Sequence, residues 1–185
     1  MRVIAGRYKG RRLKAPDWEG LRPTSDKLRE TLFNILAPRL EGARVIDGYA
    51  GTGAIGIEAL SRGAAHVTFI ERDPRARRLI EENLAGCGVE GGYTIRGGDV
   101  AAVLPSMGTD HCDLILLDPP YDSATSEVLD LSARMLAPGG QVVLERSTRH
   151  EPETPPTLER VRDVKSGDST LSFFTVRSVR LSCPP

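Results

Sequence analysis

The sequence has few cysteines, few aromatic residues and no long hydrophobic run. Its three cysteines, Cys87, Cys112 and Cys183, form neither a close pair nor a metal-ligand spacing, which argues against a disulfide scaffold or a zinc site and fits a reducing cytoplasm. The longest strongly apolar stretch is the four residues 114–117, whereas a transmembrane helix needs about 20. Because no apolar segment follows the first basic residues, we expect no secretory signal, no membrane contact and a cytoplasmic protein.

The chain also lacks a net charge, but its charges are unevenly distributed. Residues 1–44 contain 11 Lys and Arg against 5 Asp and Glu, so this part is positive and the remainder is equally negative. A basic arm joined to an acidic body suggests that the arm binds phosphates and that the body binds a cationic or neutral ligand. Of the 25 basic residues 21 are Arg, which a GC-rich genome alone also produces, so an ordinary solvated surface remains an alternative.

The pattern of the chain predicts a doubly wound α/β fold. From residue 44 onward short apolar strands alternate with amphipathic helices, which is typical of a mostly parallel sheet covered by helices on both faces. The expected strands are 45–46, 67–70, 93–96, 112–117 and 141–145, and the expected helices are 54–61, 74–86 and 127–136, with a short apolar turn after Asp99 and a sharp Pro-Gly-Gly turn at 138–140.

The two ends of the chain have their own patterns. Residues 2–13 predict two short strands in a small hairpin, an appendage to the body, and a helix capped by Ser25 is expected to end before Pro38. Residues 158–164 and 171–179 flank a Ser-Gly-Asp turn and predict an antiparallel hairpin at the sheet edge. We therefore expect a basic hairpin extension over residues 1–20 and one catalytic domain over residues 21–185.

A glycine-rich loop, residues 48–53, follows the first strand of the predicted sheet. Glycines allow a tight turn and a close approach to a ligand, and the next helix points its free N–H groups at the same place. Residues 51–56 also match the G-x-G-x-x-G dinucleotide pattern, with Glu71 18 residues after Gly53. A nicotinamide cofactor and a purely structural turn are thus both possible at this point.

Asp47, at the end of the strand before this loop, favours a different ligand. A carboxylate there would repel a pyrophosphate, whereas it suits the ammonium and sulfonium groups of S-adenosylmethionine. Glu71 and Asp99 end the second and third strands and would accept hydrogen bonds from the ribose hydroxyls and the adenine amino group. The alternative for both is a solvated carboxylate.

The tetrapeptide Asp118-Pro119-Pro120-Tyr121 follows the fourth strand. Its prolines remove two N–H groups, so the segment offers carbonyls and a carboxylate but few donors. Such an edge fits an exocyclic amino group held by Asp118 and the Pro119 carbonyl, with the base stacked on Tyr121. The alternative is a Pro-Pro turn that only ends a buried strand.

The topology of a doubly wound sheet places these two segments together. Its first and fourth strands are central neighbours, and ligands bind outside their carboxyl ends, where the winding reverses. Because Asp47 and Asp118 end these two strands, we expect the glycine loop and the tetrapeptide to share one pocket.

Several motifs together resemble the RsmD-type methyltransferases, which modify N2 of one guanine in small-subunit (16S) ribosomal RNA. The resemblance runs along the whole chain and is carried by Arg-Val-Ile-Ala-Gly at 2–6, Arg-Pro-Thr at 22–24 before Arg-Glu-Thr-Leu-Phe-Asn at 29–34, residues 47–64 and the tetrapeptide. It implies a Rossmann-like class I methyltransferase fold with a seven-stranded sheet, S-adenosylmethionine as the methyl donor, and 16S rRNA as the partner, within the small subunit or an assembly intermediate.

The resemblance also implies roles for individual residues. The donor site would be lined by Asp47, Tyr49, Gly51, Thr52, Gly53, Glu71 and Asp99, and the catalytic site by Asp118, Pro119, Pro120 and Tyr121, without a metal. Gly48-Tyr49 stands where Cys-Phe or a similar pair is common in the family, which keeps the aromatic residue. No role follows for Arg22, Thr24 or Arg29.

The basic arm completes the hypothesis, since Arg7, Lys9, Arg11 and Arg12 are the leading candidates to contact RNA phosphates. Three other functions remain open: an adenine-N6 DNA methyltransferase, which shares the tetrapeptide, an NAD-dependent oxidoreductase, and an RNA-binding module without activity.

Overall fold

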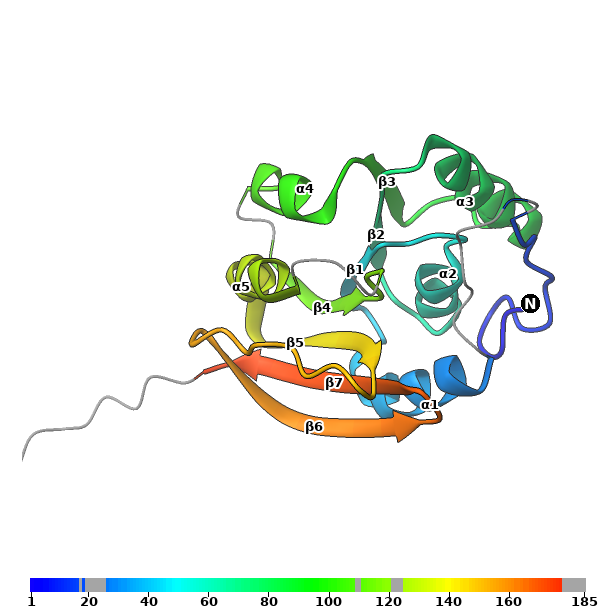
Figure 1. The fold of residues 1–185 in the computed structure, drawn as a ribbon. Coiled ribbons are helices and arrows are strands. Elements are labelled where there is room, and N and C mark those ends of the chain that lie inside the picture. Colours follow the sequence, from blue (N-terminus) through cyan, green and yellow to red (C-terminus); the bar gives the residue numbers. More distant parts are fainter. Residues whose placement is uncertain (17, 19–25, 109–110, 121–124, 178–185) are drawn as a thin grey trace, which may run out of the picture.

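One mostly parallel sheet organises the molecule, and helices cover both of its faces (Figure 1). The computed structural model describes residues 1–16, 18, 26–108, 111–120 and 125–177. The elements in chain order are α1 (Asp26–Leu36), the 3-10 turn η1 (Ala37–Arg39), β1 (Arg44–Gly48), α2 (Ala54–Ser61), β2 (His66–Glu71), α3 (Pro74–Cys87), β3 (Tyr93–Gly97), α4 (Val100–Ser106), β4 (Cys112–Leu117), α5 (Thr125–Met135), β5 (Leu136–Ser147), β6 (Leu158–Ser166) and β7 (Ser169–Val176).

The strand order is β3-β2-β1-β4-β5-β7-β6 in the described part of the chain, which confirms the expected Rossmann-like arrangement. β1 pairs in parallel with both β2 and β4, so the first and fourth strands are neighbours as predicted. β7 runs antiparallel to β5 and β6, and the β6–β7 hairpin closes the edge of the sheet.

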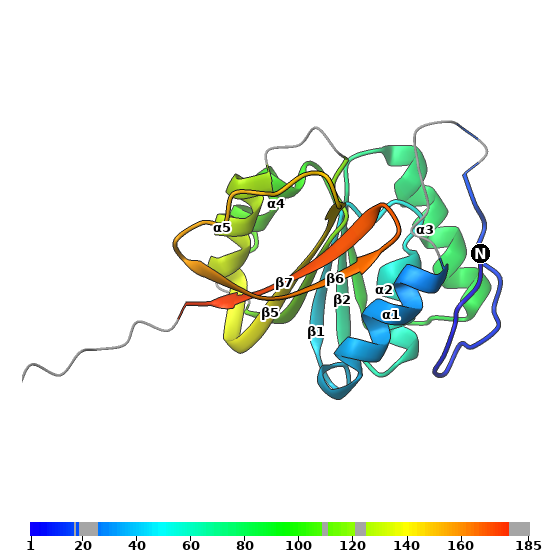
Figure 2. The same cartoon turned by 60° about the horizontal axis from the view of Figure 1, so that its bottom comes forward.

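Two hydrophobic clusters, one on each face of the sheet, hold these layers together. On one face α1, α2 and α3 pack against residues such as Val45, Leu116 and Phe173. On the other face α4 and α5 cover Ile46, Leu117 and their neighbours. Figure 2 shows α1 and α2 side by side on the first face. The alternation of adjacent strand residues between the clusters is what a sheet buried on both faces requires.

The helix starts follow local sequence signals. Asp73 caps α3 by accepting a hydrogen bond from Arg75 N at 2.8 Å, and Pro74 occupies the first turn, as predicted. Helix α2 has the predicted bounds. Ser25, the predicted cap of α1, and Val179, the predicted end of the last strand, lie outside the described residues.

Two expectations were wrong in detail. The apolar turn after Asp99 is the short helix α4, because the Asp99 carboxylate accepts from Ala101 N at 3.0 Å and so caps a helix. The turn expected at residues 138–140 lies within β5, because Leu136 already pairs with Cys112 of β4. A register shift between Cys112 and Leu114 accommodates the additional residues.

The N-terminal segment forms a hairpin with a single antiparallel bridge, between Arg2 and Arg12. It is packed on the body, since Val3 and Leu13 are 1% and 5% exposed and belong to the core cluster of the α1–α3 face. The backbone N–H groups of Ile4 and Ala5 donate to the buried Glu58 carboxylate of α2 at 2.7 and 3.0 Å. The hairpin is therefore fixed to the helix that follows the glycine loop.

Candidate active site

The glycine loop turns sharply at the carboxyl end of β1. Tyr49, Gly51 and Gly53 have positive φ angles of 64°, 54° and 76°, and Tyr49 is the one non-glycine residue of this kind in the described chain. A left-handed tyrosine is strained, and such strain is found mostly at functional sites. Ala50 N donates to Ile70 O at 3.0 Å, which fixes the loop beside the end of β2.

Asp47 lies beneath this loop and is 2% exposed. Its carboxylate accepts from Gly56 N in the first turn of α2 at 2.7 Å. Burial raises the pKa of Asp47 well above its usual value; the Gly56 N–H opposes the rise, and the neighbouring carboxylates of Asp118 and Glu71 add to it. A cationic ligand above the loop would relieve this accumulation of negative charge.

Glu71 connects the loop to the second strand. Its two carboxylate oxygens accept from Gly51 N and Asp73 N, each at 2.8 Å, and the residue is 8% exposed. Each oxygen has a second lone pair, so the predicted contact with ribose hydroxyls stays chemically open. Asp99 is exposed and also caps α4, so one of its oxygens is already engaged.

The backbone carbonyl of Thr52 accepts a hydrogen bond from Asn83, a residue that the sequence did not single out. Asn83 of α3 donates to Thr52 O at 2.9 Å and accepts from Lys14 N at 2.7 Å. Asn83 is 2% exposed, so this bridge between the glycine loop and the N-terminal segment is shielded from water. A buried polar residue on the apolar face of a predicted helix is the signal that could have identified it.

The first residue of the tetrapeptide lies beside the first residue of the glycine loop in the folded chain. β1 and β4 pair through Gly48 and Leu117, and Asp118 N donates to Gly48 O at 3.5 Å. Pro119 is partly buried and Pro120 is exposed, while Tyr121 lies outside the described residues. The structure thus brings together Asp47, the glycine loop and Asp118, as the predicted topology requires.

These residues fit S-adenosylmethionine. The carboxylates of Glu71 and Asp118, whose charges add to the raised pKa of the buried Asp47 carboxyl, give the site a negative potential that suits a ligand with two cationic groups. In the described ranges no group of three or more His, Cys, Asp or Glu side chains is arranged to hold a metal ion. Likewise, none of the described helices combines the length and the apolar character that a membrane span requires.

A pocket that the sequence analysis did not predict lies beside the tetrapeptide, at the carboxyl ends of β4 and β5. This β4–β5 pocket has a volume of about 250 Å³. It has apolar walls from Pro119, Pro120, Leu144 and Pro152, and polar groups from Thr125, Glu145, Arg146, Ser147 and His150. Glu145 could have been recognised from the sequence, because like Asp47, Glu71 and Asp118 it is an acidic residue near the carboxyl end of a strand of the parallel sheet.

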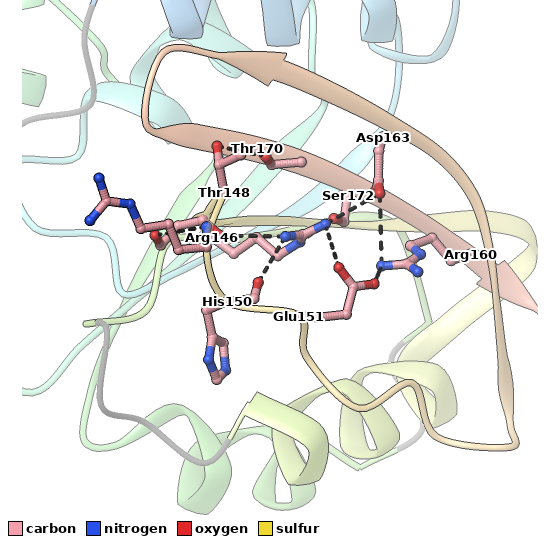
Figure 3. Close-up of polar contacts among 10 residues, drawn as sticks. Arg146, Thr148, His150, Glu151, Arg160, Asp163, Thr170 and Ser172 are labelled. Carbon is pink, nitrogen blue, oxygen red and sulfur yellow. Dashed lines mark hydrogen bonds and ion pairs between the residues drawn. The ribbon is translucent and has the colours of Figure 1, made fainter.

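Arg146 supports the wall of this pocket (Figure 3). Its guanidinium donates to Ser172 Oγ at 2.8 Å and to the backbone carbonyl of His150 at 2.8 Å, and it pairs with Glu151 and Asp163, each at 3.2 Å. Arg146 is only 8% exposed, and planar, charge-assisted contacts of this kind are strong. The network therefore holds the segment after β5 in one position.

The predicted RNA contacts, Arg7, Lys9, Arg11 and Arg12, are all exposed on the N-terminal hairpin. Arg29, for which no role was predicted, is fully buried and donates to Arg2 O at 2.6 Å and to Asp26 at 3.0 Å. It connects α1 with the start of the hairpin, and burial lowers its pKa.

Comparisons with known proteins agree with this geometry. The family model described as conserved hypothetical protein 95 matches residues 1–175. The chain is 43% identical over 121 residues to the ribosomal RNA small subunit methyltransferase D of Escherichia coli, an alignment that covers 65% of this chain and 60% of that protein. It thus matches about three fifths of the length of this relative. It is also 35% identical over 183 residues to YlbH of Bacillus subtilis, a candidate rRNA methyltransferase, which covers 96% of this chain and all of that protein.

Solved structures show the same fold along nearly the whole chain. A candidate methyltransferase of Escherichia coli, yhhF, has a TM-score of 0.83 at 30% identity, covering 95% of this chain and 97% of that one. The Thermus thermophilus protein TTHA0928 has a TM-score of 0.81 at 29% identity, covering 95% and 99%. The match over residues 1–175, the shared fold and the paired glycine loop and tetrapeptide together show that the chain belongs to the conserved hypothetical protein 95 family, that of the RsmD-type methyltransferases.

Proposed function

We propose that this protein transfers a methyl group from S-adenosylmethionine to the exocyclic N2 amino group of a guanine in 16S ribosomal RNA. The observation that supports the proposal is the pairing of Gly48 with Leu117: the glycine loop, with Asp47 before it and Glu71 hydrogen-bonded to it, begins beside the acceptor-rich tetrapeptide. The names of the relatives support rRNA as the substrate. They favour this function over an adenine-N6 DNA methyltransferase, a nicotinamide oxidoreductase or an inactive RNA-binding module.

The donor side of the site would be formed by residues around the glycine loop. S-adenosylmethionine, when bound, supplies an electrophilic methyl group on a positively charged sulfur. Asp47 and Glu71 balance that charge, and the left-handed turns at Gly51 and Gly53 allow the backbone to approach the ligand closely. Asp99, Thr52 and Tyr49 would complete this side.

The acceptor side would hold a guanine that has been flipped out of the RNA. Asp118 and the Pro119 carbonyl accept the two N2–H bonds, and Tyr121 provides a surface for stacking. The nitrogen forms a bond to the methyl carbon as the carbon–sulfur bond breaks and sulfur takes the electron pair. Asp118 stabilises the positive charge that develops on nitrogen, and the amine proton then passes to Asp118 or to water.

The identity of the product tests this function directly. Small ribosomal subunits from a strain that lacks the gene are incubated with the purified protein and labelled donor, and the digested rRNA is analysed by mass. We expect N2-methylguanosine as the labelled nucleoside. N6-methyladenosine, or no transfer at all, would refute the proposal.

The basic hairpin would bind the phosphates of the RNA, since its four predicted cations are all exposed. We expect replacement of Arg7, Lys9, Arg11 and Arg12 by Gln to weaken RNA binding. The slope of log affinity against log salt concentration should fall by about 0.7–0.9 for each phosphate that is no longer neutralised. Replacement of Arg162 and Lys165, exposed on β6, serves as the matched control. Unchanged RNA affinity in the hairpin variant would contradict this role, and donor affinity is expected to stay the same.

A further inference from the structure

The β4–β5 pocket lies where the rest of a base would extend once its amino group is held by the tetrapeptide. Pro119 and Pro120 belong both to the predicted catalytic segment and to the wall of the pocket. The volume of about 250 Å³ is below the usual range for drug-sized ligands, roughly 300–1,000 Å³, and is suited to a smaller planar group. Leu144 and Pro152 add apolar surface against which such a group can pack.

Strand register places Glu145 beside Asp118. β4 and β5 pair Leu116 with Val143 and Leu117 with Leu144, so the next residues along the chain are Asp118, directly after the end of β4, and Glu145 within β5. Glu145 also lines the β4–β5 pocket itself. One oxygen of Glu145 accepts from Ser169 Oγ at 3.0 Å, which orients the carboxylate.

We propose that the β4–β5 pocket binds the target guanine and that Glu145 is its specificity-determining residue, accepting the N1–H next to the N2 amino group. This inference rests on the proposed function. Guanine presents adjacent donors at N1 and N2, whereas adenine presents a lone pair at N1, which would face the lone pairs of the carboxylate. A carboxylate beside the amino-binding edge therefore selects guanine and rejects adenine.

The remaining polar edge of guanine, the O6 acceptor, has donors available on the far wall. The imidazole of His150 projects from the segment after β5 toward α5 (Figure 3), and Ser147 contributes a hydroxyl to the pocket. The Arg146 network holds both in place, since the guanidinium donates to the carbonyls of Ser147 and His150 at 3.3 and 2.8 Å. Arg146 is thus a positioning residue for this wall.

The test compares guanine with 2-aminopurine, which keeps the 2-amino group but has a lone pair at N1 and no O6. Single-turnover methylation is measured on rRNA that carries either base at the target position. For the unaltered protein we expect a preference for guanine of roughly ten- to hundred-fold, the size expected for a hydrogen bond to a charged group. Glu145→Gln should reduce this preference at least several-fold, because the amide can donate to the N1 lone pair as well as accept from N1–H.

Glu153→Gln is the matched control, since Glu153 is an exposed carboxylate after β5 that does not line the pocket. It should keep the full preference. The ratio of the two rates cancels any general loss of activity, and comparing this ratio between the variant and the unaltered protein cancels any difference in intrinsic reactivity between the bases. An unchanged ratio in Glu145→Gln would overturn the inference.

Two outcomes separate this inference from the proposed function. If the unaltered protein transfers no methyl group to rRNA that carries guanine, the proposed function itself is wrong. If it methylates guanine and 2-aminopurine equally well, the function stands and the role of Glu145 is refuted, even where the variant fails to fold. Thermal unfolding and donor binding of both variants show whether each one is folded.

Discussion

The donor side and the acceptor side of the site are built in different ways. Around the glycine loop the polar contacts join side chains to backbone: Asp47 to Gly56 N, Glu71 to Gly51 N, and Asn83 to Thr52 O. Around the β4–β5 pocket side chains also join one another: besides its contacts with the backbone carbonyls of Ser147 and His150, Arg146 pairs with Glu151 and Asp163 in a charged network. The donor side is therefore fixed by the path of the chain, and the acceptor side depends on the identity of its side chains.

This difference predicts that substitutions on the two sides have different consequences. Acceptor-side changes should alter activity or base preference while leaving stability and donor affinity in place. Donor-side changes should affect folding and donor binding together, because the same backbone groups serve both.

The largest effect is expected for Asp118→Ala. It removes an acceptor aimed at the amino group that becomes positively charged, so we expect methyl transfer to fall by about 10²–10³-fold. Isothermal titration should show that the variant still binds the donor. Turnover close to that of the unaltered protein, with donor still bound, would rule out the role of Asp118. It would also contradict the expectation that acceptor-side side chains determine activity.

A smaller effect, on stability, is expected for Gly56→Ala in the donor half. A Cβ atom there would overlap the Phe69 ring and lie 2.8 Å from Val67 Cγ1, so the free energy of unfolding should fall by about 1–3 kcal/mol. Gly86→Ala in α3 is the control, because its Cβ would meet no atom within 4 Å and should add roughly 0.5–1 kcal/mol. Chemical denaturation of the two variants measures both, and equal stabilities would contradict the close packing beneath the loop.

The smallest effect concerns pH. Because the pKa of Asp47 is raised in the folded protein above its usual value of 3.8, Asp47 favours the folded state most at low pH. This contribution disappears as pH rises through the raised pKa, so the ligand-free protein should become less stable in that range. Asp47→Asn keeps an acceptor for Gly56 N and should flatten this part of the profile.

Binding of a cationic donor should reverse the shift and release a proton from Asp47. Calorimetric titrations in buffers of different ionisation enthalpy detect this release. A donor-binding enthalpy that is independent of the buffer, or an unaltered stability profile in Asp47→Asn, would show that Asp47 is already ionised.

The sequence was sufficient to predict the central architecture and the position of the glycine loop after the first strand. The alternation of strands and helices, the cap at Asp73 and the glycine loop after Asp47 are local patterns, and local patterns suffice where neighbouring backbone groups make the contacts. The sequence was not sufficient for α4, where an acidic cap converts an apolar turn into a helix, or for residues 136–140, where pairing with β4 overrides the Pro-Gly-Gly signal.

The β4–β5 pocket could not be predicted in the same way. Its walls come from the ends of two strands, the segment after β5 and the start of α5, and they meet only because β4 and β5 pair. Arg146 was missed because its partners Asp163 and Ser172 lie on β6 and β7, beyond the reach of any local pattern. Tyr121, Arg22 and Thr24 lie outside the described residues, so their roles stay predictions.

Helix α2 contacts both Asp47 on the donor side and the basic N-terminal hairpin, two regions that are separate in the sequence. Its first turn holds Asp47 through Gly56 N, and its last turn holds the basic hairpin through Glu58 and Ser61. Eight helical residues span about 12 Å, and neither end can shift without the other. Under the proposed function, α2 therefore fixes the distance between the RNA phosphates bound by the hairpin and the nitrogen that is methylated. The target nucleotide would then be selected by its distance along the RNA from those phosphates as well as by its shape.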